Sequence, residues 1–138
     1  MDQFPTAQNV LLKTQIAQLS QKLMELPNQI TEQQTKLLEM HDVASKTQAR
    51  IETIESDIMA EIASERVAED KKKYPNEQGR SAELKSRLNI NDNFKLYKED
   101  QEKMDKNVAK AKIELQRLEN EFKAIKSIAY MVGAAYAI

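Results

Sequence analysis

The sequence contains no cysteine and no tryptophan, and it has only two glycines and three prolines. Without cysteine the chain cannot form disulfides or thiolate metal sites, and it is compatible with a reducing compartment. Two glycines cannot build a glycine-rich phosphate loop. Aromatic residues make up only 5% of the chain, fewer than a compact core normally holds. These shortages predict long helices joined by few turns.

An excess of charge of one sign is also missing. The chain has 21 basic and 22 acidic residues, for a net charge of −1. Affinity for nucleic acid driven by bulk charge is therefore not indicated. The first residues lack a basic region followed by an apolar run, so we expect no signal peptide. The charge-free stretch 127–138 is shorter than the roughly 20 apolar residues that cross a bilayer, so we expect no membrane segment.

The apolar residues recur at every third or fourth position in the last third of the chain. This spacing keeps one narrow helix face turned toward a partner helix, as the a and d positions of a coiled coil do. Gln101 is the only polar residue in the series. The series comprises Phe94, Tyr97, Gln101, Met104, Val108, Ala111, Leu115, Leu118, Phe122, Ile125, Ala129 and Val132.

A second series with the same spacing occupies the first half of the chain. It passes through Pro27 without losing phase, so Pro27 either kinks one long helix or joins two helices tightly. Beyond Ile58 we expect the series to fade into Glu61, Glu65 and Ala68. The series comprises Leu12, Ile16, Leu19, Leu23, Leu26, Ile30, Gln33, Leu37, Met40, Ala44, Thr47, Ile51, Ile54 and Ile58.

Proline and asparagine divide the predicted single, elongated helical domain of residues 1–138. Pro75 disfavours helix at the residue before it, so the first arm should end near Lys73 or Tyr74. Asn76 is a good N-cap for a short helix of about 77–88, and Asn91 or Asp92 can cap the last one. The predicted parts are an overhang helix (6–26), a first arm (27–73), a connector (74–93), a second arm (94–132) and an apolar tail (133–138). No sheet is expected.

Matched lengths predict how the arms pair. Residues 30–70 and 94–132 would each span roughly 60 Å as helix. The predicted fold is therefore all-α, a long antiparallel coiled-coil hairpin with a short helix in its connector. Facing polar residues select a register that places Glu61 against Gln101, and a slip of one heptad is the main alternative. This register pairs Ile58 with Met104, Ile51 with Ala111, Met40 with Phe122, and Glu65 with the Tyr97 hydroxyl.

That register leaves the overhang helix without a partner inside the chain, apart from the short tail. Burial of one leucine side chain contributes about 1.5–3 kcal/mol, so an exposed leucine face favours association. We therefore expect a homo-oligomer, a dimer or a tetramer. The predicted oligomer interface consists of Leu12, Ile16, Leu19, Leu23 and Leu26.

The residues that could bind a metal or act in catalysis are not expected to cluster into a site. His41 is the only histidine, and a metal site needs at least three convergent ligands. We interpret the acidic pairs as solvated helix faces. Glycosidase-type catalysis needs two carboxylates across a cleft, and a two-helix arm has no cleft. We therefore expect no catalytic residues, no cofactor, no metal and no enzymatic activity.

The connector is the best candidate for a functional surface. Basic and aromatic side chains together can hold a single nucleic-acid strand by stacking and phosphate contact. Acidic neighbours dilute the charge, so we favour a solvated turn over nucleic-acid contact. The candidate contact residues are Lys71, Lys72, Lys73, Tyr74, Arg80 and Arg87.

Several of these residues also belong to a familiar pattern. The run Tyr74-Pro75-Asn76-Glu77-Gln78-Gly79-Arg80 is followed by Leu84, Leu88, Asp92 and Tyr97, and later by Leu118-Glu119 and Phe122-Lys123-Ala124-Ile125-Lys126. The pattern, over roughly residues 74–131, resembles small helical proteins of tailed bacteriophages encoded near single-strand annealing or other recombination genes.

The resemblance implies a phage accessory protein in the host cytoplasm that binds a partner, of phage or host, in DNA recombination or replication. It implies no catalytic residues. Three alternatives stay open: direct single-strand binding through the connector, inhibition of a host defence or nuclease protein, and a scaffold of the virion.

Overall fold

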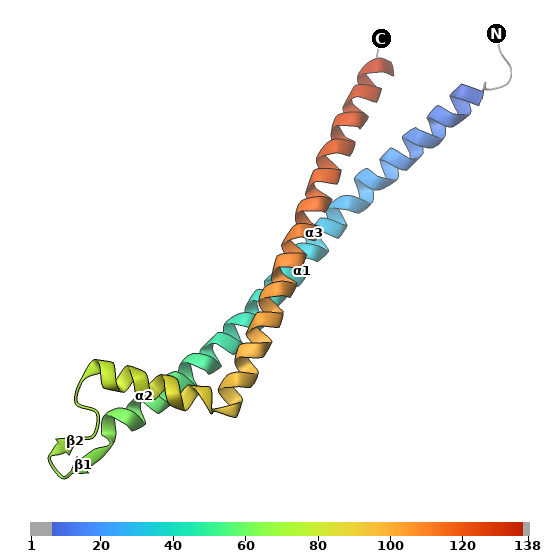
Figure 1. Ribbon diagram of the computed structural model, residues 1–138. Helices are drawn as coiled ribbons and strands as arrows, with labels where there is room; N and C mark the ends of the chain where they lie inside the picture. The colour runs from blue at the N-terminus through green and yellow to red at the C-terminus, as the bar shows by residue number, and fades with distance from the viewer. Residues whose placement is uncertain (1–6, 137–138) are drawn as a thin grey trace, which may run out of the picture. The chain divides into compact units, whose positions relative to one another are not determined.

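A computed structural model describes residues 7–136, with side-chain environments for Val10 and for Leu12–Gly133 (Figure 1). Three helices occur in this part: α1 (Ala7–Ser64), α2 (Glu77–Asn89) and α3 (Asp92–Tyr136). Two short strands, β1 (Arg66–Ala68) and β2 (Lys71–Lys72), lie between α1 and α2. The all-α prediction is confirmed, apart from this small sheet. Residue 6 of the predicted overhang and residues 137–138 of the predicted tail lie outside the described residues.

The chain divides into two compact units. Unit 1 holds Met1–Leu38 and Ala109–Ile138, and unit 2 holds Glu39–Val108. Each unit therefore contains one segment of α1 and one segment of α3. Unit 2 also contains the strands and α2.

Helix α1 continues through Pro27. Proline lacks the N–H that would bond to the carbonyl of Leu23, and an interior proline costs about 3 kcal/mol. Leu26 beside it is only 3% exposed, and Leu23 and Ile30 pack into the same cluster. Burial of such side chains contributes about 1.5–3 kcal/mol each, which offsets the lost hydrogen bond. Of the two options that the sequence left open, the structure has one helix.

Unit 1 is built around a cluster of residues from both apolar series. Leu26 of α1 is buried with Leu118 and Ile125 of α3. Lys22 Nζ lies 2.7 Å from Glu121 Oε1, and Gln33 Nε2 donates to the Ala111 carbonyl over 3.2 Å. Residue numbers rise along α1 as they fall along α3, so the two segments are antiparallel within this unit.

The same direction holds in unit 2. Thr47 Oγ1 lies 3.6 Å from Met104 Sδ, and Gln101 Nε2 donates to Gln48 Oε1. The Arg50 guanidinium carbon lies 5.7 Å from the centre of the Tyr97 ring. Nearly every residue of the two predicted apolar series is buried or half-buried, and the one exception is Ile16. The faces predicted from the spacing are confirmed.

The predicted register is wrong. Met104 contacts Thr47 and not Ile58, which is about three helical turns further along α1. Gln101 pairs with Gln48 and not with Glu61. Glu65 binds Arg87 and not the Tyr97 hydroxyl. A shift of the predicted register by one heptad, which was the main alternative, is also wrong, because seven residues are too few to bring Met104 to Thr47.

Helix α2 explains the shift. Leu88 of α2 is buried in one cluster with Ile58 and Ile62 of α1, and Leu84 and Phe94 pack against it. The last turns of α1 are therefore covered by α2, and α3 meets α1 closer to its middle. Ile62, 1% exposed, continues the apolar series where Glu61 had been expected.

The first arm ends earlier than predicted, at Ser64 instead of near Lys73. Ser64 Oγ donates to the Glu61 carbonyl over 2.8 Å, and Glu65 N donates to the same carbonyl over 3.1 Å at the helix end. β1 and β2 then pair antiparallel, with Arg66 opposite Lys72, and Lys73 N donates to the Glu65 carbonyl over 3.0 Å. The expectation of no sheet was wrong, because Glu69-Asp70 forms a turn that returns the chain on itself.

Both asparagine caps have the predicted role. Asn76 Oδ1 accepts from Gly79 N over 2.7 Å and starts α2. Asn91 Oδ1 accepts from Phe94 N over 2.8 Å at the start of α3, so Asn91 and not Asp92 is the cap. Each side-chain oxygen satisfies an N–H that the first helical turn leaves free.

Candidate interaction surfaces

The connector folds into a small structured region, here called the head and defined as residues 65–91. Arg87 holds it together: its Nη2 lies 2.7 Å from Glu65 Oε1 and its Nε lies 2.8 Å from Glu83 Oε1. Lys73 Nζ approaches Glu65 at 3.8 Å. The hydrogen bond with Arg87 lowers the pKa of Glu83, and the two carboxylates raise the pKa of Arg87. These pairs join the end of α1 to the last turn of α2.

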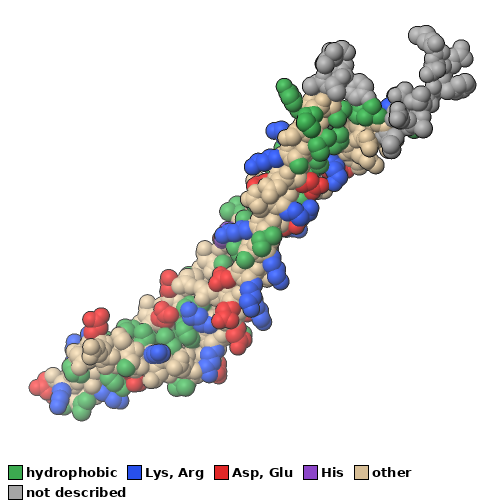
Figure 2. Space-filling view, turned by 45° about the horizontal axis from the view of Figure 1, so that its top comes forward, with side chains coloured by type: hydrophobic (Ala, Val, Ile, Leu, Met, Phe, Trp, Pro, Cys, Tyr) green, Lys and Arg blue, Asp and Glu red, His purple; other side chains and the backbone are tan. Residues whose placement is uncertain are grey.

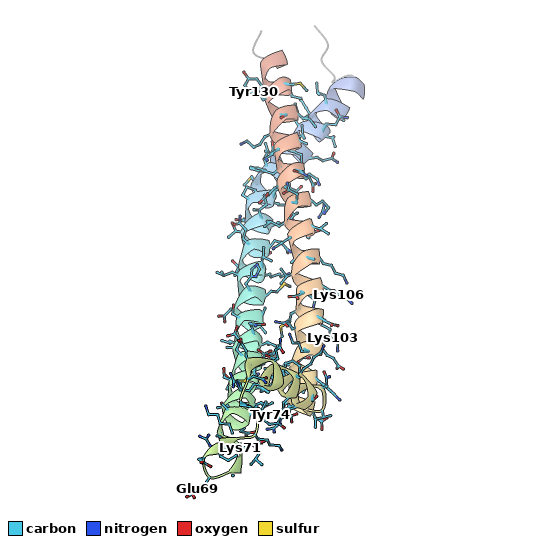
Figure 3. The ribbon with its side chains drawn as sticks, turned by 60° about the vertical axis from the view of Figure 1, so that its left-hand side comes forward. Glu69, Lys71, Tyr74, Lys103, Lys106 and Tyr130 are labelled. Carbon is cyan, nitrogen blue, oxygen red and sulfur yellow. The ribbon has the colours of Figure 1, made fainter. Side chains whose placement is uncertain are left out.

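The head reduces the number of basic side chains available to a nucleic acid. Arg87 is committed to its two carboxylates, and Arg80 Nη1 donates to the Tyr74 carbonyl over 3.2 Å. Lys73 bridges to Glu65 and lies 5.5 Å from the Tyr74 ring centre. Lys71, labelled in Figure 3, and Lys72 lie on the exposed strand β2. Like Arg80, they make no ion pair in the described part of the chain.

Tyr74 is half-buried and packs against the cluster of Ile58, Ile62 and Leu88. Stacking of a nucleobase needs an accessible ring face. One side of the Tyr74 ring meets this cluster, and Lys73 lies over the ring. The tyrosine therefore supports the fold of the head, as the solvated-turn interpretation expected.

Three large apolar side chains on and beside the head are exposed. Val67 lies on β1, Ile90 caps the end of α2 and Leu96 lies near the start of α3. Ile90 is 77% exposed, and it lies in a turn that the hydrogen bond from Asn91 N to the Leu88 carbonyl closes over 3.2 Å. Exposed apolar side chains can contribute to contact with another protein, so these three are candidates for such a contact.

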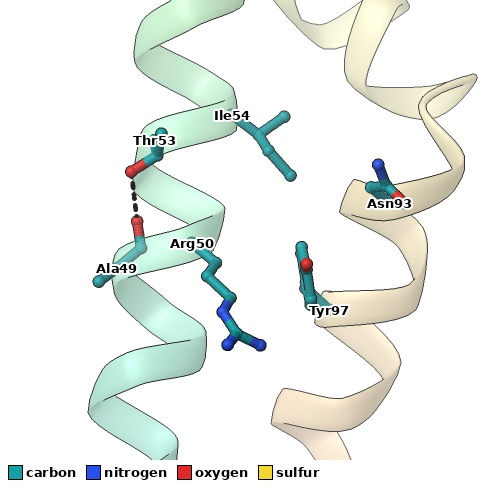
Figure 4. Close-up of a pocket in the computed structure, with 6 residues that line it drawn as sticks. All are labelled: Ala49, Arg50, Thr53, Ile54, Asn93 and Tyr97. Carbon is teal, nitrogen blue, oxygen red and sulfur yellow. Dashed lines mark hydrogen bonds between the residues drawn. The ribbon is translucent and has the colours of Figure 1, made fainter.

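Unit 2 also has a shallow hollow between α1 and α3, which Figure 4 shows in close-up. Arg50 and Tyr97 point toward one another across it, and Thr53 Oγ1 donates to the Ala49 carbonyl over 2.9 Å. The guanidinium and the ring satisfy each other through a cation–π contact. Arg50, Tyr97 and Thr53 in this hollow therefore already have partners in the fold.

A second hollow lies in unit 1, at the predicted oligomer interface. Here the first turns of α1 and the last turns of α3 separate toward their ends (Figure 1). The hollow, here called the fork groove, contains three residues of the predicted interface. Its lining comprises Ile16, Leu19, Ser20 and Leu23 from α1 and Ala129, Val132 and Gly133 from α3.

The premise behind the predicted interface was wrong in part. Leu19, Leu23 and Leu26 do have partners within the chain, because they pack with Leu118, Phe122 and Ile125. Leu26 is buried and so cannot contact a second chain directly. Leu12 is half-buried and Ile16 remains exposed. Whether these residues hold an oligomer together stays a prediction.

The sequence analysis missed the α3 side of the fork groove and the role of Ile62. Both had signals. Ala129 is a small member of the apolar series and Gly133 directly follows its last member, which permits a hollow there. Ile62 lies four residues after Ile58, a step that the 3.6-residue helical period allows as readily as a step of three.

Comparison with known proteins found no relative of this chain. No protein-family model matches the chain, and no curated protein or solved structure is significantly similar to it. The phage resemblance therefore stays a prediction. None of the described helices has the length and apolar character needed to cross a membrane.

Proposed function

We propose that this chain is a non-enzymatic accessory protein that binds a protein partner in phage DNA recombination or replication. In this proposal the head is the contact surface, and an antiparallel coiled-coil hairpin of α1 and α3 carries it. The observation that supports the proposal most directly is the exposure of Val67, Ile90 and Leu96 on and beside a region fixed by ion pairs.

A fixed apolar surface suits protein binding for a physical reason. Association must offset roughly 4–15 kcal/mol of lost translational and rotational freedom, and side chains that are already held lose less on binding. Arg87 of α2 pairs with Glu65, the residue that follows α1, and Leu88 packs α2 on Ile58 and Ile62. The three exposed apolar residues are thus carried by backbone that the fold has already ordered.

The charge pattern supports a protein partner over a nucleic acid. Arg87 and Lys73 already face carboxylates, so fewer cations are available to replace the counterions of a phosphate backbone. Glu69 and Asp70 lie in the turn between the strands that carry Arg66 and Lys72.

The test is affinity purification of the tagged chain from the cells that naturally contain it. The proposal expects a recombination or replication protein to co-purify, and expects Ile90→Glu with Leu96→Glu to remove it. A matched control is Val43→Glu, which changes another exposed apolar residue of unit 2, outside the head. Capsid or tail proteins would favour the virion scaffold, and a nuclease or defence protein would favour the inhibitor. Either result would contradict the proposal.

A further inference from the structure

We propose that the fork groove is a binding site for the fork of a second copy of this chain. In the resulting two-fold dimer, the first turns of α1 and the last turns of α3 of each copy fill the groove of the other. This interface differs from the one predicted from the sequence, because it uses both helices of unit 1 and excludes the buried Leu26.

The first argument is that the apolar series continues past the point where the two helices cover each other. Leu26, Leu118 and Ile125 are buried in unit 1. Toward the chain ends Leu19 is half-buried, and Ile16 is 36% exposed. A helix face with coiled-coil spacing packs against another helix. Toward the chain ends this face is thus covered less completely by the other helix of the same chain.

The second argument is the absence of charge. In a chain whose residues are 31% charged, residues 7–21 contain one charged side chain, Lys13, and residues 127–136 contain none. Charged side chains resume at Lys22 in α1 and at Lys126 in α3. Burial of an unpaired charge is costly, so an uncharged groove suits an uncharged occupant. The same segments of a second copy have this character and meet the groove with no like-charge repulsion.

The third argument is shape. The small residues Ser20, Ala129 and Gly133 line the groove between larger apolar side chains. A Cβ atom added at Gly133 would meet nothing within 4 Å, so there is free space at this position. Small residues let a further helix approach closely. Figure 2 shows hydrophobic side chains gathered near this end of unit 1, and Val10, Ile128 and Met131 are exposed there.

Symmetry favours a second copy over a different protein. In a two-fold dimer both grooves are filled by one contact, and the apolar face is closed. A membrane surface is a poorer occupant, because interfacial helices carry basic residues along their polar face. Residues 7–21 and 127–136 offer only Lys13 for that purpose.

The experiment is light scattering coupled to size-exclusion chromatography on the full chain. The wild-type chain should have the mass of two chains. Gly133→Glu places a charge in the groove and should halve the mass without changing helix content by circular dichroism. Gly133→Ala adds only a methyl group in free space and should keep the two-chain mass. If Gly133→Glu fails to fold, Ser20→Glu tests the opposite wall and should halve the mass in the same way.

Leu38→Glu and Ile113→Glu are the matched controls, because both residues are 71% exposed in unit 1 and lie outside the groove. Both variants should keep the two-chain mass. A wild-type chain that is monomeric at every concentration would overturn the proposal. The proposal would also be overturned if the Gly133→Glu variant remained dimeric and the Leu38→Glu variant became monomeric. Binding of a monomeric wild-type chain to phosphatidylglycerol vesicles would assign the groove to lipid and overturn it as well.

Discussion

Thr47 Oγ1 lies 3.6 Å from Met104 Sδ, and this contact identifies the register of α1 against α3 in unit 2. It predicts that Thr47→Cys with Met104→Cys will be linked within one chain by a short thiol-specific reagent. The chain has no native cysteine that could compete. The control keeps the same partner and moves the other cysteine to Ile58, the position that the sequence had predicted. Mass spectrometry should find efficient linkage only with Thr47, and efficient linkage with Ile58 instead would restore the predicted register.

Leu88 should contribute most of the attachment of α2. It is 9% exposed and packs with Ile58 and Ile62. Leu88→Ala removes buried methyl groups and leaves a cavity, which typically costs about 2–5 kcal/mol. Leu96→Ala is the control, since Leu96 is largely exposed and surface changes usually stay within about 0.5 kcal/mol. Urea titration followed by circular dichroism measures both, and equal effects would show that α2 is not held by this cluster.

Pro27→Ala should raise the free energy of unfolding. The alanine supplies an N–H for the Leu23 carbonyl and removes the ring clash, a change worth up to about 3 kcal/mol. Asn28→Ala, at the next exposed position of α1, improves helix propensity by only about 0.5 kcal/mol. The two melting temperatures should therefore differ. A Pro27→Ala chain no more stable than Asn28→Ala would mean that the helix already accommodates the missing bond.

The ion pairs of the head predict how stability depends on pH. The hydrogen bond from Arg87 lowers the folded-state pKa of Glu83 below its ordinary value of 4.5. A lowered pKa adds stability that is fully present above 4.5 and is lost as the pH falls through the lower folded-state value. Arg87→Met removes this contribution. The difference in urea midpoint between wild type and variant should be largest near neutral pH and should shrink below 4.5; a constant difference would assign the effect to packing.

The sequence predicted the buried faces well and the register poorly, for one physical reason. Spacing specifies which side of a helix is apolar, and the residues from Phe94 to Val132 are indeed buried or half-buried. The register of α3 against α1 depends on which part of α1 is left uncovered by other elements. Here α2 covers Ile58 and Ile62, and neither leucine of α2 is in phase with the series in α3. A pattern within one helix carries no information about such a third element.

The local signals at the connector were more reliable than those at the end of α1. Asn76 and Asn91 act as caps because a short side chain bonds to its own neighbouring backbone. The end of α1 at Ser64 has neither glycine nor proline to mark it. The basic residues were identified by composition, but composition could not show that Glu65 and Glu83 would hold Arg87.

The uncharged lining of the fork groove has a thermodynamic consequence. Association through Ile16, Leu19 and Val132 would depend on the release of water from apolar surface, with no ion pair at the contact. Such association has a negative heat-capacity change and weakens on cooling. Ionic strength within the physiological range should leave it almost unchanged, whereas sulfate should strengthen it. The chain would then respond to temperature and to the activity of water more than to the salt content of its surroundings.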